Sequence, residues 1–393
     1  MFDSLLIFIV CYIVREPSTE MTASFIYTKN YSLYDYGPAH PMKIQRLRLC
    51  YELLEAYNIF QNPCVKIIEP IPADISDVIA IHNEGYIKAL KAISTNPDDP
   101  SLYSYGLGFG DNPGFKGVYD WSMLYTGGSI QAAKMVSSGE AIVAFNIAGG
   151  LHHAMPEKAS GFCYINDAAV AINHLLKQGK RVAYIDIDAH HGDGVQHIFY
   201  STDKVLTISF HESGEFLFPG TGYTENIGKG DGMGYSVNLP YYPGTDDRVF
   251  VWGFEQIVPP LIEAYKPDFI VTQLGVDSMA TDPLAHLMLT TNGFCTMIER
   301  MRSFNIPWIA LGGGGYNLSN VARAWALAFS IMCSIELPDE IPGICVDKLK
   351  RFGLEGTTLR DKETISGDEE TTRRWAEEKV SYIQKRIFPL HGL

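Results

Sequence analysis

Histidine, aspartate and tyrosine side chains follow several short apolar runs of this sequence. His152 and His153 end the stretch AGGLHH, and the stretch DIDAH contains Asp186, Asp188 and His190. In an extended chain, residues two apart lie on the same face, so those three side chains would point to one side. Carboxylates and imidazoles bind divalent metals and move protons in hydrolytic enzymes. The residue types and their spacing indicate a site for metal-assisted hydrolysis.

Asp188 and His190 are candidate ligands of one cation, and Asp277, which follows a separate apolar run, is a third. Two carboxylates and one imidazole leave a coordination position open, as in catalytic rather than structural zinc sites. Such an oxygen-rich set would also accept Fe(II) or another divalent metal. The alternative for Asp-x-His alone is a turn whose side chains bond their own backbone. The histidine pair and Tyr316 favour the metal site.

The elements that must position these residues are strands and helices in alternation. Short apolar, β-branched runs are typical of parallel strands covered on both faces, and the sequence predicts them at 142–147, 182–187, 205–210, 269–274 and 308–311. Helical patterns lie between most of them, at 167–177, 248–265 (interrupted by Pro259 and Pro260), 292–303 and 320–334. This alternation predicts an α/β fold, an open and mostly parallel sheet with helices on both faces.

The ionisable residues gather at one edge of the predicted sheet. Each of the following sets comes directly after a strand: His152 with His153, Asp188 with His190, His211, Asp277, and Tyr316. Ligands of open α/β sheets bind beyond the carboxyl ends of the strands. The stretches 95–116 and 211–247 lack clear periodicity, and we expect them to be long loops that build the site at this edge.

The composition is that of a globular protein of 393 residues, with 46% hydrophobic and 19% charged residues. It excludes a disordered chain, a fibrous repeat and a coiled coil. We expect one domain over 21–393 that ends in a helical segment. We interpret 1–20 as an N-terminal extension, and the sequence leaves two interpretations of it open. Met21 is one candidate start, and an interfacial or packed segment is the alternative. The apolar stretch 5–14 would be about 15 Å long as a helix, too short to span a membrane.

Charge and cysteine usage restrict the partners and the compartment. Lys and Arg number 31 against 45 Asp and Glu, a net charge of −14. So acidic a chain lacks the basic surface of a general nucleic-acid binder and would more readily attract a lysine-rich peptide or a polyamine. The seven cysteines are scattered and form no Cys-x-x-Cys pair. Neither a disulfide framework nor a thiolate zinc site is expected, which favours a reducing compartment.

Nine stretches resemble, in order, the zinc-dependent histone deacetylase superfamily, in particular its class I and acetoin-utilization-type members. They are HPMKIQRLR (40–48), YGLGFGDNP (105–113), IAGGLHHA (147–154), SGFCYIND (160–167), DIDAHHGDGVQ (186–196), LFPGTG (217–222), QLGVD (273–277), DPLAHL (282–287) and LGGGGYN (311–317). The resemblance implies the arginase/deacetylase fold. It also implies hydrolysis of the amide of N6-acetyl-lysine in proteins, with release of acetate.

Carried over by position, the resemblance implies that Asp188, His190 and Asp277 bind zinc. Tyr316 would donate its hydroxyl to the oxyanion while zinc polarises the same carbonyl. The four glycines before Tyr316 would let that loop approach the metal closely.

The resemblance also implies roles for the tandem histidines. His153 would act first as a general base and later as an acid toward the leaving amine, and His152 would orient groups and stabilise charge. Asp186 behind His152 and Asp193 behind His153 would fix the tautomer of each ring and raise its basicity.

Further matches concern the substrate. Phe162, which follows Gly161, and Phe218 match the two aromatic walls of the family's acyl-lysine tunnel. Such an apolar slot suits the four-carbon stem of a neutral acyl-lysine, at about 0.8 kcal/mol per buried methylene. Asp111 matches the rim aspartate that holds the substrate's backbone amides, and Leu284 matches an apolar position at the rim.

Three more sites follow from the resemblance alone. Arg46 matches a basic residue near the internal channel that releases acetate. One structural potassium site would use Asp186, main-chain oxygens of Asp188, His190 and Phe210, and the hydroxyl of Ser209. A second would use the carbonyls of Phe199, Thr202, Val205 and Tyr235.

Three other functions are alternatives to deacetylation of protein lysines. The arginase-like ureohydrolases share the fold but hold two manganese ions, and they would need carboxylates where this chain has Gly192 and Met279. Deacetylation of small molecules such as acetylpolyamines is a closer rival, because it would suit the acidic charge. A catalytically silent acyl-lysine binder would have lost Tyr316, one of the histidine pair or a metal ligand, and all are present.

The nuclear members of the family place arginines around an inositol-phosphate pocket shared with a corepressor. Lys43 is kept here, but Pro283 and Ser319 stand at the later arginine positions. We therefore expect neither partner. No basic nuclear-localisation run is found, so we expect a cytoplasmic enzyme of bacterial or archaeal type.

Overall fold

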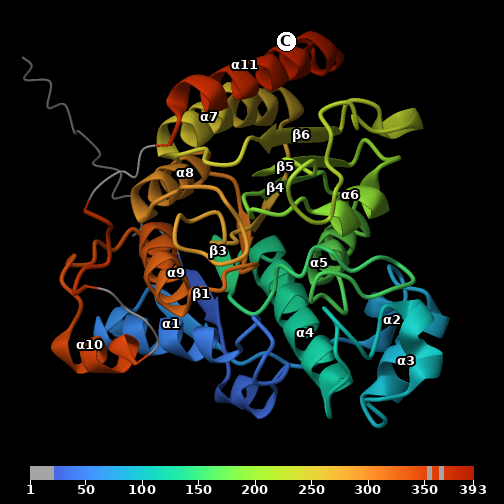
Figure 1. Ribbon diagram of the computed structural model, residues 1–393, viewed down its shortest axis with the longest axis vertical. Coiled ribbons are helices and arrows are strands. Elements are labelled where there is room, and N and C mark those ends of the chain that lie inside the picture. The colour runs from blue at the N-terminus through green and yellow to red at the C-terminus, as the bar shows by residue number, and fades with distance from the viewer. Residues whose placement is uncertain (1–21, 352–355, 363–366) are drawn as a thin grey trace, which may run out of the picture.

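The computed structural model describes residues 22–351, 356–362 and 367–393. Their strands form one parallel sheet of eight, in the order β2-β1-β3-β8-β7-β4-β5-β6 (Figure 1). The strands are β1 (Ala23–Ile26), β2 (Val65–Ile68), β3 (Val143–Asn146), β4 (Val182–Asp186), β5 (Val205–Glu212), β6 (Ser236–Tyr241), β7 (Phe269–Gln273) and β8 (Trp308–Leu311). The prediction of an open, parallel α/β sheet is confirmed.

The five strands predicted from the sequence are β3, β4, β5, β7 and β8, with ends shifted by at most two residues. The three others were not predicted. β1 and β2 are only four residues long, and β2 lies at one edge of the sheet with two exposed residues. β6 falls inside 211–247, which we expected to be a loop, and it contains Pro240. Because β6 is the other edge strand, a residue without an N–H group is tolerated there.

Helices cover both faces of the sheet, as predicted. The α-helices are α1 (Gln45–Ala56), α2 (Ile75–Val78), α3 (Glu84–Ile93), α4 (Val118–Ser137), α5 (Asp167–Leu176), α6 (Asp193–Phe199), α7 (Asp247–Tyr265), α8 (Thr291–Ser303), α9 (Leu318–Cys333), α10 (Gly343–Lys350) and α11 (Glu369–Arg386). Short 3-10 helices lie at Lys29–Leu33, Ile59–Gln61, Pro100–Tyr105, Gly230–Gly232 and Phe388–His391. The stretch 95–116 therefore contains a helical turn rather than loop alone.

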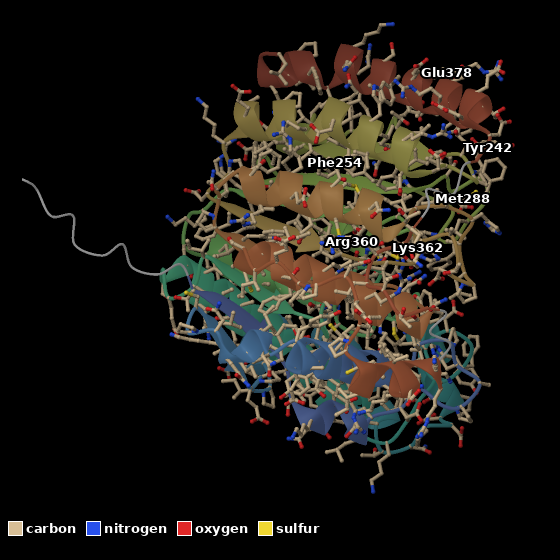
Figure 2. The ribbon with its side chains drawn as sticks, turned by 90° about the vertical axis from the view of Figure 1, so that its left-hand side faces the viewer. Tyr242, Phe254, Met288, Arg360, Lys362 and Glu378 are labelled. Carbon is tan, nitrogen blue, oxygen red and sulfur yellow. The ribbon has the colours of Figure 1, made fainter. Side chains whose placement is uncertain are left out.

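Two hydrophobic layers separate the helices from the sheet. Successive residues of a strand face opposite sides, so Phe145 of β3 joins the layer beneath α1 and α9, whereas its neighbour Ala144 joins the layer beneath α4 and α5. α1, α9, α8 and α7 pack side by side over the first layer, and α11 packs on α7. Figure 2 shows this stack from the side, with Phe254 of α7 among the labelled residues.

The expected interruption at Pro259 and Pro260 was wrong, because α7 runs unbroken through both prolines. Each proline removes the hydrogen bond to the carbonyl four residues earlier. Those carbonyls belong to Glu255 and Gln256, which are only partly buried, as are the prolines themselves. Water can therefore reach the freed carbonyls, while the opposite side of α7 is held in the core.

The division into an N-terminal extension over 1–20 and one domain over 21–393 stays a prediction, since 1–21 lie outside the described residues. The apolar stretch 5–14 falls in the same part of the chain. Within the described residues, no helix combines the length and the apolarity that crossing a membrane requires.

Candidate active site

The ends of β4 and β7, which are neighbours in the sheet, bring the predicted metal ligands together. His190 Nδ1 lies 3.1 Å from Asp188 Oδ1 and 3.0 Å from Asp277 Oδ2. All three residues are buried, and one ligand atom from each lies within 4.8 Å of the others. The convergence is as predicted, but the reason given for it was wrong. β4 ends at Asp186, and 188–190 form a bend rather than an extended chain.

The charges of this cluster fit a bound cation. Burial, together with the neighbouring charge of Asp188, raises the pKa of Asp277 to about 7. Two carboxylates side by side in a buried place repel each other unless a positive charge lies between them. Two carboxylate oxygens and one imidazole nitrogen are suitable ligands for a divalent metal. Asp188, His190 and Asp277 would hold it.

Neighbouring groups fix the orientation of the ligands. Asp188 Oδ2 accepts hydrogen bonds from Gln273 Nε2 at 2.6 Å and from the backbone N–H of Gly314 at 2.8 Å. Asp277 Oδ1 accepts from the N–H of Ala189 at 2.9 Å. A Cβ at position 314 would lie only 2.1 Å from Asp277 Oδ2, so the close approach of this loop requires glycine. No role for Gln273 was predicted from the sequence.

His152 and His153 follow β3 and lie in contact with each other. His152 Nδ1 lies 2.7 Å from Asp186 Oδ2, and His153 Nδ1 lies 2.7 Å from Asp193 Oδ1. The carboxylates stand where the sequence predicted them, one behind each ring. Tyr184 also donates its hydroxyl to Asp186 Oδ2, at 2.7 Å. Both imidazole rings therefore donate their Nδ1–H groups and keep Nε2 for other partners.

The two Nε2 atoms lie 3.0 Å apart and share one hydrogen bond. Burial alone would lower the pKa of His152, but the carboxylates of Asp186 and Asp188 outweigh it and raise that pKa to about 9. Burial and the charge of His152 lower the pKa of His153. His152 therefore carries the shared proton, and His153 is neutral with an accepting Nε2.

Two residues at the start of α5 hold the backbone around the histidine pair. Asp167 accepts from the N–H groups of Gly150 and Leu151, at 3.0 and 2.9 Å. Asn166 Nδ2 donates to the carbonyls of His152 and Ala154, each at 3.1 Å. Both residues lie in the stretch SGFCYIND, and neither had a predicted role. The only available signal was a polar pair at a helix start, which ordinarily indicates a cap.

Tyr316 lies at the end of the glycine-rich loop that follows β8. Burial raises the pKa of its phenol far above the usual value, so the hydroxyl stays protonated and can donate. The N–H of Tyr316 donates to Asp282 Oδ2 at 2.7 Å, a contact that the sequence did not reveal. Arg46 is buried in α1, lies over the ring of Trp325, and donates to the carbonyl of Gly315 at 2.9 Å.

Aromatic side chains flank the histidines and Tyr316. The Phe162 ring lies 5.6 Å from that of Tyr316, and the Phe218 ring lies 5.1 Å from that of His153. A Cβ at Gly161 would lie 2.5 Å from the His153 ring and 2.9 Å from Phe218, so this position is enclosed by both. Phe162 has φ +69, a conformation uncommon for an aromatic residue and typical of functional sites.

The two predicted rim residues lie outside these aromatic walls. Asp111 is exposed, and its carbonyl accepts from His40 Nε2 at 3.1 Å. The His40 ring also packs against that of Phe162, with centroids 4.5 Å apart, and so connects the rim to one wall. This link was not predicted from the sequence. Leu284 is partly exposed, and its N–H donates to Asp282 Oδ1 at 3.0 Å.

The residues of the first predicted potassium site are neighbours across two strands. Asp186 of β4 pairs with Ser209 of β5, and Phe210 follows. His211 Nε2 donates to the Gly222 carbonyl at 3.0 Å, so its Nδ1 accepts the hydroxyl proton of Ser209 at 2.9 Å. The lone pairs of the Ser209 oxygen therefore stay free to bind a cation.

The residues of the second predicted potassium site lie around the turn from α6 to β5. Phe199 ends α6, Thr202 lies in the turn, and Val205 begins β5. The carbonyl of Tyr235 accepts from Thr207 N and Thr207 Oγ1, at 2.9 and 3.3 Å. Since both lone pairs of this carbonyl are in use, a cation there would compete with Thr207.

A second metal site of the ureohydrolase type has no room here. A Cβ at Gly192 would lie 2.5 Å from Asp186 Oδ2, so no carboxylate side chain could project from this position. Met279 is buried in the hydrophobic core.

Comparisons with known proteins agree with this geometry. The family described as "Histone deacetylase domain" matches residues 40–332. The chain is 40% identical over 322 residues to Histone deacetylase clr6 of Schizosaccharomyces pombe, covering 81% of this chain and 78% of that protein. It is 41% identical over 333 residues to Histone deacetylase 1 of Homo sapiens, covering 84% of this chain and 68% of that protein.

A solved structure shares the fold as well. The crystal structure of an HDAC homolog from Aquifex aeolicus matches with a TM-score of 0.85 and 32% identity, over 92% of this chain and 100% of that chain. The family match, the relatives and the solved structure all cover most of this chain. This protein is a member of the histone deacetylase family.

Proposed function

We propose that this protein removes acetyl groups from lysine side chains of proteins by metal-dependent hydrolysis of the amide. The observation that carries this function is the buried cluster of Asp188, His190 and Asp277 beside a histidine pair. A binder of acyl-lysine has no need of two buried carboxylates that repel each other, nor of a neutral histidine held ready to accept a proton. A hydrolase needs both.

Zinc is the metal we propose, and the same ligand set would accept Fe(II). When bound, it would polarise the acetyl carbonyl and lower the pKa of a water molecule. The protein's own contribution is to hold two oxygens and one nitrogen in a buried cluster with an open side, and to fix Asp188 through Gln273 and Gly314.

The histidine pair would move the protons of the reaction. His153 is the neutral ring of the pair, and the one lone pair of its Nε2 accepts from His152 in this structure. With the attacking water in place, that lone pair would turn from His152 to the water, take its proton and later give it to the lysine amine. Asp193 holds the other nitrogen of His153 and thereby fixes its tautomer. His152, positively charged, would stabilise negative charge that develops nearby. The protonated phenol of Tyr316 would donate to the oxyanion.

The aromatic walls suit an acetylated rather than a charged lysine. Phe162 and Phe218 would enclose the apolar stem of the side chain, and Asp111 and Leu284 would meet the peptide at the rim. Arg46, buried and bonded to the loop of Tyr316, would guide acetate out through the interior. Potassium would be structural. The free lone pairs of Ser209 support the first site, whereas the double acceptance at Tyr235 makes the second weaker.

The identity of the substrate separates our proposal from its alternative. We would assay the zinc-loaded protein on an acetyl-lysine peptide beside an acetylpolyamine, with a hydroxamate chelator as control. Hydroxamate-sensitive release of acetate from the peptide is the expected result. Release from the polyamine alone would contradict protein deacetylation and indicate small-molecule metabolism. Silence on both substrates, with metal bound, would overturn the proposal and support a binder of acyl-lysine.

Two further expectations stay predictions. Cytoplasmic localisation can be checked by fractionation of cells that express the full chain. Independence from a corepressor and inositol phosphate can be checked by adding inositol phosphate to the assay, which should leave the rate unchanged. Lys43 supports the second expectation, because its ammonium group already donates to the carbonyls of Gly37 and Pro38, at 3.2 and 2.6 Å.

A further inference from the structure

One buried carboxylate, that of Asp282, holds the backbone of Tyr316, the proposed oxyanion donor, and of Leu284, a proposed rim residue. Its Oδ2 accepts from the N–H groups of Tyr316 and Asn317, at 2.7 and 3.2 Å. Its Oδ1 accepts from the N–H of Leu284, at 3.0 Å. Asp282 is only 7% exposed, and it lies in the loop between β7 and α8. A single side chain thus connects the proposed oxyanion donor to the rim of the tunnel.

The loop that carries Tyr316 needs such an anchor. Four glycines precede Tyr316, and two of them, Gly313 and Gly315, have φ of +133 and +136. Glycine backbone loses the most conformational freedom when it is fixed, so this loop has little rigidity of its own. Before Tyr316, the loop is held by Asp188 at the N–H of Gly314, by the N–H of Val276 at the Gly314 carbonyl (3.0 Å), and by Arg46 at the Gly315 carbonyl (2.9 Å). At Tyr316 itself, the backbone N–H is held by Asp282.

A second contact joins the same two loops. Asn317 Nδ2 donates to the carbonyl and the hydroxyl oxygen of Thr281, each at 3.3 Å, and Asn320 Nδ2 donates to the same hydroxyl at 2.8 Å. These bonds lie on the far side of Tyr316 from the glycines. The bond that Asp282 accepts from the N–H of Tyr316, at 2.7 Å, is shorter than all three, and Tyr316 is the residue whose hydroxyl must reach the reacting carbonyl.

We infer that Asp282 is a positioning residue for deacetylation, which acts by fixing the place of the Tyr316 hydroxyl and of Leu284 at the rim. The inference rests on the proposed function, because it assumes that Tyr316 donates to the oxyanion. Asp282 is no ligand of the metal cluster, since both its oxygens face N–H groups. Its charge also acts on Asp277 and His190 of the metal cluster, but only the effect that passes through Tyr316 disappears when the Tyr316 hydroxyl is removed.

A double-mutant cycle tests this inference. In Asp282→Asn, one oxygen becomes an NH₂ group, which cannot accept, so at least one of the backbone N–H groups loses its partner. We expect kcat for an acetyl-lysine peptide to fall about tenfold with zinc still bound, and KM to change less than kcat. In the Tyr316→Phe background the same substitution should change kcat by no more than about twofold, because the group it positions is gone. An equal loss in both backgrounds would overturn the inference, as would unchanged kcat in Asp282→Asn.

Two further variants keep the test sharp. The side chain of Asp282→Ser ends one bond before the carboxylate oxygens, so the N–H of Tyr316 loses its acceptor. This variant should reproduce the fall in kcat and the dependence on the Tyr316 hydroxyl. Asp247→Asn is the matched control. Asp247 is about as buried as Asp282, but it accepts from the N–H and the hydroxyl of Thr290, at 2.8 and 2.5 Å, and not from Tyr316. It should lower thermal stability and leave kcat unchanged.

Hydrogen exchange supplies a measurement that needs no substrate. Peptides covering 312–320 and 282–288 should exchange faster in Asp282→Asn than in the wild type, while a peptide covering 291–303 should not change. Unchanged exchange at 312–320 would show that Asp282 does not hold this loop. If the wild type released no acetate but the exchange result held, the proposed function would fail and the structural role of Asp282 would stand.

Discussion

The Nε2 atoms of His152 and His153 lie 3.0 Å apart, while each Nδ1 atom lies 2.7 Å from its own aspartate. Three protons therefore serve four ring nitrogens, and the pair carries one positive charge. The charge belongs to His152, because Asp186 and Asp188 raise its pKa to about 9 against the effect of burial. This arrangement leaves His153 neutral, which is the state that a general base requires.

The first prediction concerns the charge of His152. Burial and the positive charge of His152 both lower the pKa of His153, so replacing His152 by alanine removes the second effect and should raise that pKa. A base with a higher pKa is protonated at higher pH, and the acid limb of kcat/KM should therefore move upward by about 1–3 pH units. A pH–rate profile measures the shift. His197→Ala, an exposed histidine of α6, is the control and should not move the limb. An unmoved or lowered limb in His152→Ala would contradict the assignment.

The second prediction concerns the hydroxyl of Tyr316. Tyr316→Phe should lower kcat about 10²–10³-fold, the usual cost of removing one oxyanion donor. Metal content and thermal stability should stay near those of the wild type. Tyr382→Phe, on α11, removes a hydroxyl far along the chain from the site and should leave the rate unchanged. A near-wild-type rate in Tyr316→Phe would refute the role assigned to this residue.

The third prediction concerns the close approach of the glycine-rich loop to the metal ligands. A Cβ at position 314 would lie 2.1 Å from Asp277 Oδ2 and 2.7 Å from Asp188 Oδ2, so Gly314→Ala must displace both carboxylates. We expect zinc affinity to fall about 10–100-fold, as for other changes in the groups that orient metal ligands. Competition with a chromophoric chelator measures it. Gly343→Ala meets no atom within 4 Å and should bind zinc like the wild type. Unaltered affinity in Gly314→Ala would argue against this cluster as the metal site.

The fourth prediction concerns stability in acid. His82 is buried, donates from Nδ1 to the Met155 carbonyl at 3.0 Å, and accepts at Nε2 from the N–H of Asn166, also at 3.0 Å. Burial lowers its pKa to about 4. The unfolded chain takes up this proton near pH 6.5, but the folded chain does not until about pH 4, so stability falls as the pH is lowered across that interval.

From pH 7 to pH 5, His82 should account for about 2 kcal/mol of the lost unfolding free energy. Urea unfolding of the wild type and of His82→Gln at both pH values measures the difference between their losses. Glutamine does not titrate, so the variant should lose less stability on acidification than the wild type. Equal losses in the two proteins would show that His82 does not titrate as its surroundings require.

The sequence predicted the parts of the fold that repeat and the residues that carry the chemistry. Apolar runs predicted five of the six inner strands, all but the four-residue β1, and the residues directly after them predicted the cluster of Asp188, His190 and Asp277. These signals are local, because parallel strands end at a common edge and a residue after each strand is bound to lie there. The edge strands β2 and β6 were missed because a strand with one free edge need not be wholly apolar.

The supporting contacts could not be predicted in the same way. Asp282 bonds to the backbone of Tyr316, 34 positions away, and Asp167 bonds to that of Gly150, 17 positions away. A backbone N–H is the same for every residue type but proline, so its partner leaves no mark in the sequence around it. Only the pairing of strands and the path of loops brings such groups together.

The most direct measurement of the central claim is a zinc titration of the metal-free protein, with acetate release from an acetyl-lysine peptide recorded at each addition. One cluster of three ligands predicts that activity rises in proportion to zinc and reaches its plateau at one equivalent per chain. Full activity before any zinc is added, or no activity at one equivalent, would contradict the claim that Asp188, His190 and Asp277 hold a single catalytic metal.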